Sequence, residues 1–320
     1  MDPNKKIGDS EVVSVFSIHY PNSRVVDIED LSSGCDNWIF CVLYDEQGSD
    51  EATKVILRFP RKLSNPDCPV MHRPRFQAKI LNLLGENGIP CPKLLHVGDN
   101  YLIESYVTGI DLAKVQINCK NQLKKIFTEI GFCVKKLHSI DCCENFGYIV
   151  DIDQNRDQLI GKYDNWLSMF EEEFPANLKN CLDSRLIDQK MFQLLDDLYS
   201  DVKPYLMSYS VPRLLHSDIC GNNTRIGTNS DGMGYQFNGL IDFADCMSGD
   251  PMFDLGELLL SYYGDYTVID MFETGYRRLS AEDKHMIRFY AIHYNLWLLD
   301  SSEDTDKWMQ TLHKLVYLKT

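Results

Sequence analysis

The stretch Leu214-Leu215-His216-Ser217-Asp218-Ile219-Cys220-Gly221-Asn222-Asn223 is followed downstream by Gly239-Leu240-Ile241-Asp242-Phe243-Ala244-Asp245. Residues 228–234 between them are rich in turn-forming Asn, Ser, Asp and Gly, so the pattern predicts a β-hairpin with polar side chains at one end. One arm offers Asp218 and Asn223, and the other offers Asp242. Carboxylate and amide oxygens are hard ligands of the kind that magnesium binds, and a carboxylate can also act as a base.

The spacing His-x-Asp-x-x-x-x-Asn, followed by a strand that ends Ile-Asp-Phe, is similar to the catalytic and metal-binding segments of kinases. Either half alone is as often a turn or a core segment, but their joint occurrence in this order favours the kinase interpretation. The continuation Gly-Asp-Pro-Met-Phe-Asp-Leu at 249–255 narrows it. The stretch resembles the aminoglycoside phosphotransferase and choline kinase branch of the protein-kinase-like fold.

This resemblance implies an α+β, protein-kinase-like bilobal fold. A small β-rich N-lobe, residues 1–106, would bind the nucleotide through its sheet and one helix. A larger, mostly helical C-lobe, residues 107–320, would carry the catalytic hairpin and a helical substrate-binding subdomain. The similarity is specific in 214–258 and loose in the helices that would build the acceptor pocket, so the acceptor is left open.

The resemblance also assigns roles to single residues. Asp218 would accept or orient the proton of the attacking hydroxyl, and His216 would position the catalytic loop by hydrogen bonding. Asn223 and Asp242 would hold Mg²⁺ on the β- and γ-phosphates. Asp254 would anchor the catalytic loop from the following helix.

Asp250 and Pro251 form a good N-terminal signal for that helix. Asp250 is therefore expected to be structural and close to the site, as is Asp254.

The bulk composition limits the class of protein. The chain has 320 residues, 44% of them hydrophobic, and a net charge of −15. This charge argues against nucleic acid as the main partner, because phosphate backbones need a basic footprint. It is compatible with a cationic small substrate and also simply with solubility. The 11 cysteines form no C-x-x-C pair, and neither a signal region nor an apolar run long enough for a membrane span occurs. We expect a cytoplasmic protein with reduced cysteines and no membrane association.

The first part of the chain predicts a nucleotide-covering hairpin. A helix near 11–16 and a strand near 25–28 precede two strands at 38–44 and 53–59. The loop before the first of these two strands contributes small residues, which let backbone amides approach phosphates; Ser33, Gly34 and Asn37 are the candidates. An ordinary turn is the alternative.

Arg58 takes the place of the strand cation, usually Lys, that meets the nucleotide phosphates in kinases. Some phosphotransferase relatives resemble this Leu-Arg-x-Pro form, although a guanidinium presents its charge as a planar fork. A helix over 75–84 follows, and Gln77 falls where the family has a Glu that pairs with the cation. Gln can accept a hydrogen bond from Arg58 but brings no charge. Glu104, Ser105 and Tyr106 would form the lobe connector, whose backbone would meet the adenine edge.

Helical periodicity dominates the rest of the chain. One helix ends near Leu137, two more are expected at 156–174 and 186–206 with Pro175 and Asn177 between them, and 268–320 is expected to be all helical. The acidic run 171–173 is typical of a solvated helix face, with a wall for a cationic substrate as the alternative. The aromatic residues near the carboxyl end are expected in the core: Phe289, Tyr290, Tyr294 and Trp297.

Together these features predict a small-molecule kinase. It would transfer the γ-phosphate of ATP or GTP, with Mg²⁺, to a hydroxyl of an aminoglycoside-like or other small, possibly cationic, substrate. The alternative is a catalytically weakened nucleotide-binding module that acts through partners, because Arg58 and Gln77 replace a charged Lys–Glu pair. A protein kinase ranks lower, because the chain shows neither an Ala-Pro-Glu segment nor a long activation loop after Asp242.

Overall fold

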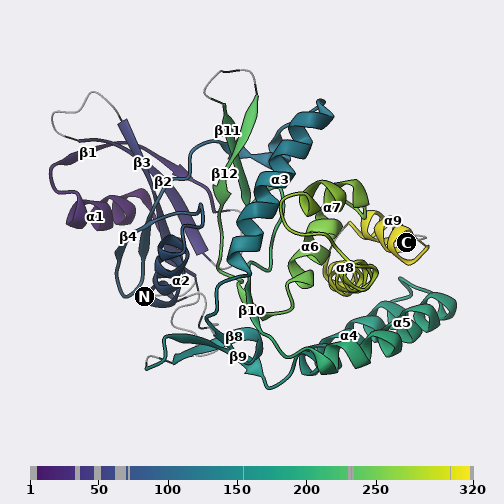
Figure 1. The fold of residues 1–320 in the computed structure, drawn as a ribbon. Helices are drawn as coiled ribbons and strands as arrows, with labels where there is room; N and C mark the ends of the chain where they lie inside the picture. The colour runs from purple at the N-terminus through teal and green to yellow at the C-terminus, as the bar shows by residue number, and fades with distance from the viewer. Residues whose placement is uncertain are drawn as a thin grey trace. The chain divides into compact units, whose positions relative to one another are not determined.

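The computed structural model describes residues 6–32, 37–46, 52–61, 70, 73–153, 155–229, 232, 234–302 and 304–317. The chain forms two compact units. We call Met1–Thr108 with Asn238–Ala244 the amino unit, and Gly109–Phe237 with Asp245–Thr320 the carboxyl unit. The predicted mixture of a β-rich amino-terminal region and a mainly helical carboxyl-terminal region is confirmed (Figure 1).

The amino unit is built on an antiparallel five-stranded sheet in the order β1-β2-β3-β5-β4, flanked by two helices. The bounds of its strands and helices are β1 Ser23–Asp30, β2 Asn37–Glu46, β3 Ala52–Pro60, β4 Leu94–Val97, β5 Leu102–Ser105, α1 Asp9–His19 and α2 Pro74–Glu86. The predicted strands at 38–44 and 53–59 and the predicted helix at 75–84 are thus confirmed, each within a few residues.

Side-chain alternation along the strands decides which residues face which helix, because successive residues of a strand point to opposite faces. Leu57 and Ile103 belong to the core cluster that α1 closes with Val12 and Phe16. Leu102 instead belongs to the cluster that α2 closes with Ala78 and Leu81. Arg58 is next to Leu57 along β3 and therefore faces the α2 side, and Glu104, two residues after Leu102, faces the same side.

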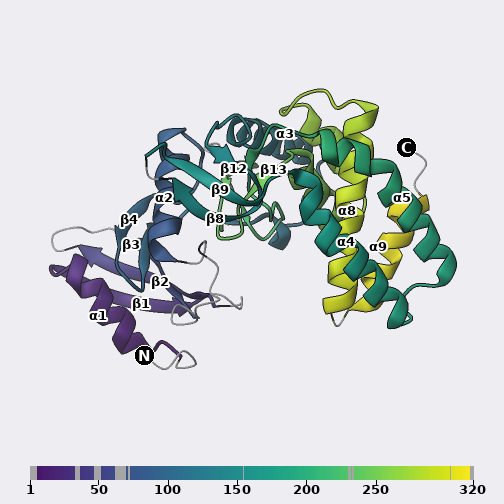
Figure 2. The ribbon, with the colours of Figure 1, turned by 90° about the horizontal axis from the view of Figure 1, so that it is seen from below.

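The carboxyl unit combines small sheets with long helices. One sheet has the order β10-β13-β8-β9-β7 and another the order β12-β11-β6. The strands of these sheets are β6 Ile110–Asp111, β7 Cys143–Glu144, β8 Phe146–Asp153, β9 Gln158–Tyr163, β10 Arg213–Leu215, β11 Thr224–Thr228, β12 Tyr235–Leu240 and β13 Met247–Gly249. The last three residues of β12 are counted with the amino unit. The helices are the 3₁₀ turn η2 Leu112–Lys114, α3 Lys120–Leu137, α4 Trp166–Asp183, α5 Gln189–Ser208, α6 Met252–Ser261, α7 Tyr266–Glu273, α8 Ala281–Ser301 and α9 Thr305–Tyr317. Helices α4, α5, α8 and α9 pack side by side (Figure 2).

The core of the carboxyl unit is strongly aromatic. Trp166 of α4 packs edge-on against Phe253 of α6 and Tyr290 of α8. Phe170 of α4 packs edge-on against Phe253 and at a tilt against Tyr290, and all four are at most 1% exposed. The expected core position of Phe289 and Tyr290 is confirmed, whereas the expectation for Trp297 is wrong because 52% of it is exposed. Trp297 follows Tyr290 by seven residues, two helical turns, and so lies on the same side of α8; helical periodicity therefore does not distinguish the two residues.

The predicted helix at 156–174 is wrong in its first part. Residues 158–163 form strand β9, which pairs antiparallel with β8. Helix α4 begins only at Trp166, where the Asn165 side chain caps it by accepting a hydrogen bond from Ser168 N at 3.0 Å. Pro175 was expected between two helices but lies inside α4. The carbonyl that a proline leaves unbonded is four residues earlier, at Glu171, which is exposed, so water can satisfy it.

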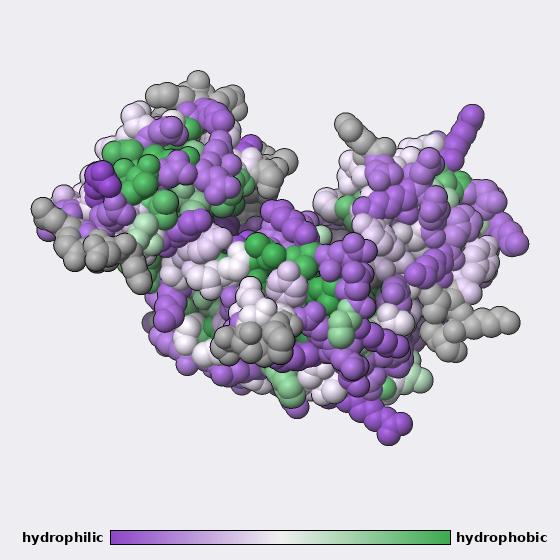
Figure 3. Space-filling view, turned by 90° about the horizontal axis from the view of Figure 1, so that it is seen from above, coloured by the Kyte–Doolittle hydropathy of each residue, from purple (hydrophilic) through white to green (hydrophobic). Residues whose placement is uncertain are grey.

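Hydrophilic residues cover much of the helical part of the surface at the right of Figure 3, as a net charge of −15 leads one to expect. Nine cysteines in the described ranges carry free thiols. Within those ranges, none of the helices has both the length and the apolar character that crossing a bilayer requires.

Candidate active site

The catalytic loop of the carboxyl unit connects β10 to β11 and presents Asp218. Asp218 is exposed, and its Oδ2 atom accepts a hydrogen bond from Asn223 Nδ2 at 2.6 Å. The same amide nitrogen donates to the Asp218 carbonyl at 3.1 Å. Both contacts use the nitrogen, so Oδ1 is the Asn223 atom suited to a cation. The loop thus places a solvent-facing carboxylate beside an oriented amide oxygen.

The backbone that precedes Asp218 is fixed by a buried carboxylate. Asp254, which is 0% exposed, accepts from His216 N at 2.9 Å through Oδ2 and from Ser217 N at 2.8 Å through Oδ1. His138 Nε2 contacts Asp254 Oδ2 at 2.9 Å, and His138 Nδ1 contacts Tyr276 Oη at 2.8 Å. This geometry agrees with the anchoring role expected for Asp254, and it brings in His138 at the end of α3, for which the sequence suggested no role.

Ser217 holds an unusual conformation next to Asp218. Its φ is +59°, in the left-handed region that a residue with a side chain rarely occupies. Its N–H donates to Asp254, and its carbonyl accepts from the Tyr294 hydroxyl at 3.3 Å. The peptide before Asp218 is therefore held from both sides.

The two other residues predicted near this loop are buried. His216 is 0% exposed, so its side chain acts within the core and its backbone N–H makes the contact with Asp254. Asp250 is 2% exposed and accepts from Met252 N, Tyr205 Oη and Tyr290 Oη, at 3.0, 3.0 and 2.8 Å. Burial raises the pKa of Asp250. Asp250 thus joins the start of α6 to helices α5 and α8.

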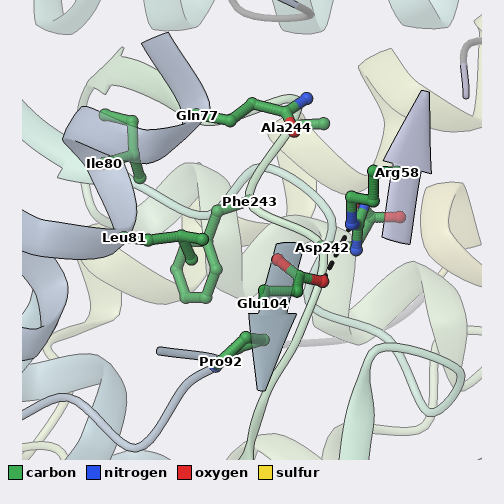
Figure 4. Close-up of a pocket in the computed structure, with 9 residues that line it drawn as sticks. All are labelled: Arg58, Gln77, Ile80, Leu81, Pro92, Glu104, Asp242, Phe243 and Ala244. Carbon is green, nitrogen blue, oxygen red and sulfur yellow. Dashed lines mark hydrogen bonds and ion pairs between the residues drawn. The ribbon is translucent and has the colours of Figure 1, made fainter. Parts of the chain in front are cut away.

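Arg58 in the amino unit lies between two carboxylates (Figure 4). Its Nε donates to Glu104 Oε1 at 2.9 Å, and its Nη1 donates to Asp242 Oδ1 at 3.0 Å. The side chains of Arg58 and Glu104 are 8% and 5% exposed, whereas that of Asp242 is 37% exposed. Burial alone would lower the pKa of Arg58, but the two carboxylates outweigh burial and raise it, so the guanidinium stays charged. Burial raises the pKa of Glu104 and Arg58 opposes the rise.

Gln77 of α2 lies on the same small cavity but does not take the family's acidic role. Its Nε2 atom is buried and makes no hydrogen bond to any residue in the described part of the chain. The cavity offers about 20 Å³ to a water-sized molecule, room for one water. Arg58, Glu104 and Asp242 also line it. Gln77 carries no charge, and the carboxylate that neutralises Arg58 from a neighbouring strand is Glu104 of β5.

The pairing of Glu104 with Arg58 was not predicted from the sequence, which suggested only a backbone role for residues 104–106. The signal was the alternation along β3 and β5, which places both side chains on one face. The neighbouring connector residues make other contacts: Ser105 Oγ accepts from Lys93 N at 2.8 Å, and the Tyr106 ring lies 5.2 Å from Lys54 Nζ.

The predicted phosphate-covering loop falls largely outside the described residues, because Ser33 and Gly34 are not among them. Asn37, the first residue of β2, is described and 6% exposed. Its Oδ1 atom is buried and makes no hydrogen bond within the described ranges.

The chemistry of the donors fits magnesium. Asn223 has an oriented amide oxygen, and Asp242 is a partly exposed carboxylate, and hard oxygen donors are what Mg²⁺ takes. In the part of the chain that the structure describes, no cluster of three or more His, Cys, Asp or Glu side chains is arranged as a metal cage.

Solved structures of similar fold are aminoglycoside phosphotransferases. The chain matches the gentamicin complex of APH(2'')-IIa with a TM-score of 0.62 at 18% identity, over 98% of both chains. It matches ADP-bound APH(2'')-Ib with a TM-score of 0.63 at 17% identity, over 97% of this chain and 100% of that one. It matches APH(4)-Ia with a TM-score of 0.65 at 15% identity, over 97% and 98%. The fold is therefore of the protein-kinase-like class that the sequence predicted.

A family model described as the phosphotransferase enzyme family matches residues 27–290. The chain belongs to this family, as the resemblance in 214–258 implied.

Proposed function

We propose that this protein is a small-molecule kinase that transfers the γ-phosphate of ATP, with Mg²⁺, to a hydroxyl group of a small acceptor. The observation that carries the proposal is the hydrogen bond of 2.6 Å between Asn223 and an exposed Asp218, on a loop that Asp254 anchors. A carboxylate held in this way can meet an acceptor hydroxyl from solvent, and membership of the phosphotransferase enzyme family supports that use.

The reaction forms a bond between the acceptor oxygen and the γ-phosphorus and breaks the bond between that phosphorus and the β–γ bridging oxygen of ATP. ADP leaves with the electron pair of the broken bond. Asp218 orients the acceptor hydroxyl and takes its proton. Asn223 and Asp242 are the ligands proposed for Mg²⁺, which neutralises phosphate charge when bound.

Arg58 is proposed to meet the inner phosphates of the nucleotide. A flexible buried cation would lose more entropy on binding than a fixed one, and the ion pair with Glu104 fixes the guanidinium in advance. This pair also supplies the negative charge that Gln77 lacks. The replacement of a Lys–Glu pair by Arg58 and Gln77 was the reason to consider a catalytically weakened module. Because Glu104 supplies the missing charge within the same unit, the active kinase is the better-supported function.

The proposed acceptor is an aminoglycoside-like or other small cationic alcohol. The net charge of −15 favours cations at long range. Similar folds have been solved with gentamicin, with streptomycin and ATP, and with hygromycin B and ADP. These ligands define the first compounds to test.

The test follows ATP consumption with Mg²⁺ against gentamicin, streptomycin, hygromycin B and choline, with GTP as an alternative donor. We expect the wild type to transfer phosphate to at least one small hydroxyl compound. The Asp218→Asn variant should transfer it to the same compound at a strongly reduced rate. Absence of a thermal shift with millimolar ATP and Mg²⁺ would contradict nucleotide binding altogether. Phosphate incorporation into proteins but into no small compound would instead identify a protein kinase.

A further inference from the structure

A tyrosine and a buried acid lie behind the catalytic loop, and the mechanism above does not use them. Tyr294, from α8, donates its hydroxyl to the Ser217 carbonyl at 3.3 Å. Glu257, from α6, lies beside Tyr294 and is 6% exposed. Both belong to the carboxyl unit, as does the loop that they approach.

Acidic groups dominate the surroundings of Glu257. Asp254 of the same helix, Asp218 of the catalytic loop, Asp245 of the following loop and Tyr294 of α8 are the groups that bear on its charge. Neither carboxyl oxygen makes a hydrogen bond of normal geometry within the described ranges. A buried carboxylate without a partner is costly, so the neutral acid is the stable form. Burial first, and then Asp254, raise the pKa of Glu257 well above its ordinary value.

The protonation of Glu257 decides where the Tyr294 proton goes. A phenol has one O–H to donate. An ionised Glu257 would attract that O–H and compete with the Ser217 carbonyl for it. A protonated Glu257 can instead donate to the phenolic oxygen, which leaves the Tyr294 O–H directed at Ser217.

We propose that Tyr294, supported by the buried Glu257 beside it, is a positioning residue for phosphoryl transfer that holds the strained Ser217 backbone and through it the neighbouring Asp218. The inference rests on the proposed kinase function. Ser217 has a φ of +59°. In the described ranges two hydrogen bonds hold its backbone: its N–H donates to Asp254, and its carbonyl accepts from Tyr294. Such a conformation persists only where its surroundings over-determine it. Loss of the Tyr294 contact would let the peptide relax and move Asp218 from its place.

The first experiment compares Tyr294→Phe with Tyr290→Phe, using ATP, Mg²⁺ and whichever of gentamicin, streptomycin and hygromycin B the wild type phosphorylates. Tyr290 lies one turn earlier on α8 and donates to Asp250 at 2.8 Å, a residue outside the catalytic loop. We expect Tyr294→Phe to lower kcat about five- to tenfold, the rate equivalent of one lost hydrogen bond, with KM for ATP unchanged. Tyr290→Phe should lower the urea midpoint but keep kcat. Equal kcat losses in both variants would overturn the positioning role.

The second experiment uses Glu257→Gln, which donates as the protonated acid does but cannot ionise. Wild-type kcat should fall on the alkaline side as Glu257 ionises, and this limb should be absent in Glu257→Gln. Because the folded-state pKa is raised, the wild type loses stability as the pH rises from about 4.3, the ordinary value of Glu, through the folded pKa. The urea midpoint of Glu257→Gln should therefore increase relative to that of the wild type as the pH is raised above about 4.3.

These readouts separate the two failures. A wild type without turnover on any compound would overturn the proposed function, and the positioning role with it. Normal wild-type turnover with an unaffected Tyr294→Phe would overturn the positioning role alone. Should Tyr294→Phe fail to fold, the alkaline limb decides: a limb that persists in Glu257→Gln, or a midpoint difference that does not change with pH, contradicts the inference.

Discussion

Arg58 and Glu104 form a buried ion pair across the neighbouring strands β3 and β5, with Nε and Oε1 2.9 Å apart. The register places Arg58 opposite Leu102 and Glu104 opposite Ile56, so the two charged residues are diagonal neighbours on the α2 face of the sheet. The pair fixes the Arg58 guanidinium and supplies the negative charge that Gln77, at a position where the sequence resemblance predicts an acid, lacks.

Glu104→Gln should destabilise the amino unit and weaken ATP binding. The variant keeps the shape of the side chain but leaves a buried guanidinium with Asp242 as its remaining partner. Breaking a buried pair costs about 3–5 kcal/mol, and the low end applies because Asp242 still compensates. Urea unfolding measures the first effect, and ATP titration measures the second.

The matched control is Asp45→Asn, which breaks the exposed pair of Arg24 and Asp45 in the same sheet, 2.7 Å long. Exposed pairs are worth about 0–1 kcal/mol, so this variant should unfold at nearly the wild-type urea concentration. Equal midpoints for Glu104→Gln and Asp45→Asn would show that the buried pair adds nothing.

Asp254→Asn should loosen the catalytic loop and destabilise the carboxyl unit. Two backbone N–H groups and His138 converge on the carboxylate, and an amide cannot accept from all of them, since its nitrogen would face donors. A hydrogen bond to a charged group is worth about 1.5–3 kcal/mol, so we expect a loss of at least that size in the free energy of unfolding, with turnover strongly reduced.

Asp270→Asn provides the comparison for that loss, because Asp270 is 63% exposed and its ion pair with Lys284 is 3.4 Å long. It should leave stability and turnover near wild type. A fully stable Asp254→Asn protein with normal turnover would refute the anchoring role.

The catalytic loop and strand β3 could be predicted from sequence because their signals are local. The predicted hairpin with arms at 214–223 and 239–245 is displaced, because β10 pairs with β13 and the paired arms are β11 and β12. The spacing from His216 to Asn223 and the alternation of β3 each lie within a few residues. The contacts that complete the site are not local. Glu104 is 46 residues from Arg58, and Tyr294 is 77 residues from Ser217. Only the register of β3 with β5, and the packing of α8 near the loop, bring these pairs together.

The same distinction explains the errors. Residues 158–163 carry no strong period of their own, and their strand exists because β8 pairs with them. Pro175 was a local signal for a helix end. Helix α4 nevertheless continues through it, because tertiary packing of its buried face, which includes Phe170 and Phe174, stabilises the helix. Trp297 lies on the same side of α8 as the buried Tyr290, so its exposure depends on how much of the length of α8 the neighbouring elements cover.

Asp218→Asn should lower kcat by about 10²–10⁴-fold, the usual contribution of a positioned base, with ATP affinity retained. A loose transition state, in which the hydroxyl proton leaves late, reduces the loss. Steady-state kinetics and ATP titration separate the two quantities. Asp245→Asn is the control, because Asp245 is also an exposed carboxylate that closely follows the second arm of the hairpin. A loss below about tenfold for Asp218→Asn would make Asp218 an orienting group and not a base.

Asp242→Asn tests the proposed magnesium ligand with little risk to the fold. Asp242 has a φ of +65°, a conformation that Asn tolerates better than most residues, and its side chain is 37% exposed. Arg58 keeps its pair with Glu104 in this variant. The lost charge should therefore act mainly on the metal: turnover should fall strongly, and the Mg²⁺ concentration needed for half-maximal rate should rise. Kinetics over a Mg²⁺ series, together with urea unfolding, measure both.

The control is Asp99→Asn, which removes the acid of an exposed pair with Arg75 in the same unit and should change neither quantity. An Asp242→Asn protein that unfolds more easily yet turns over normally at low Mg²⁺ would identify Asp242 as a structural partner of Arg58 and would remove it from the proposed metal site.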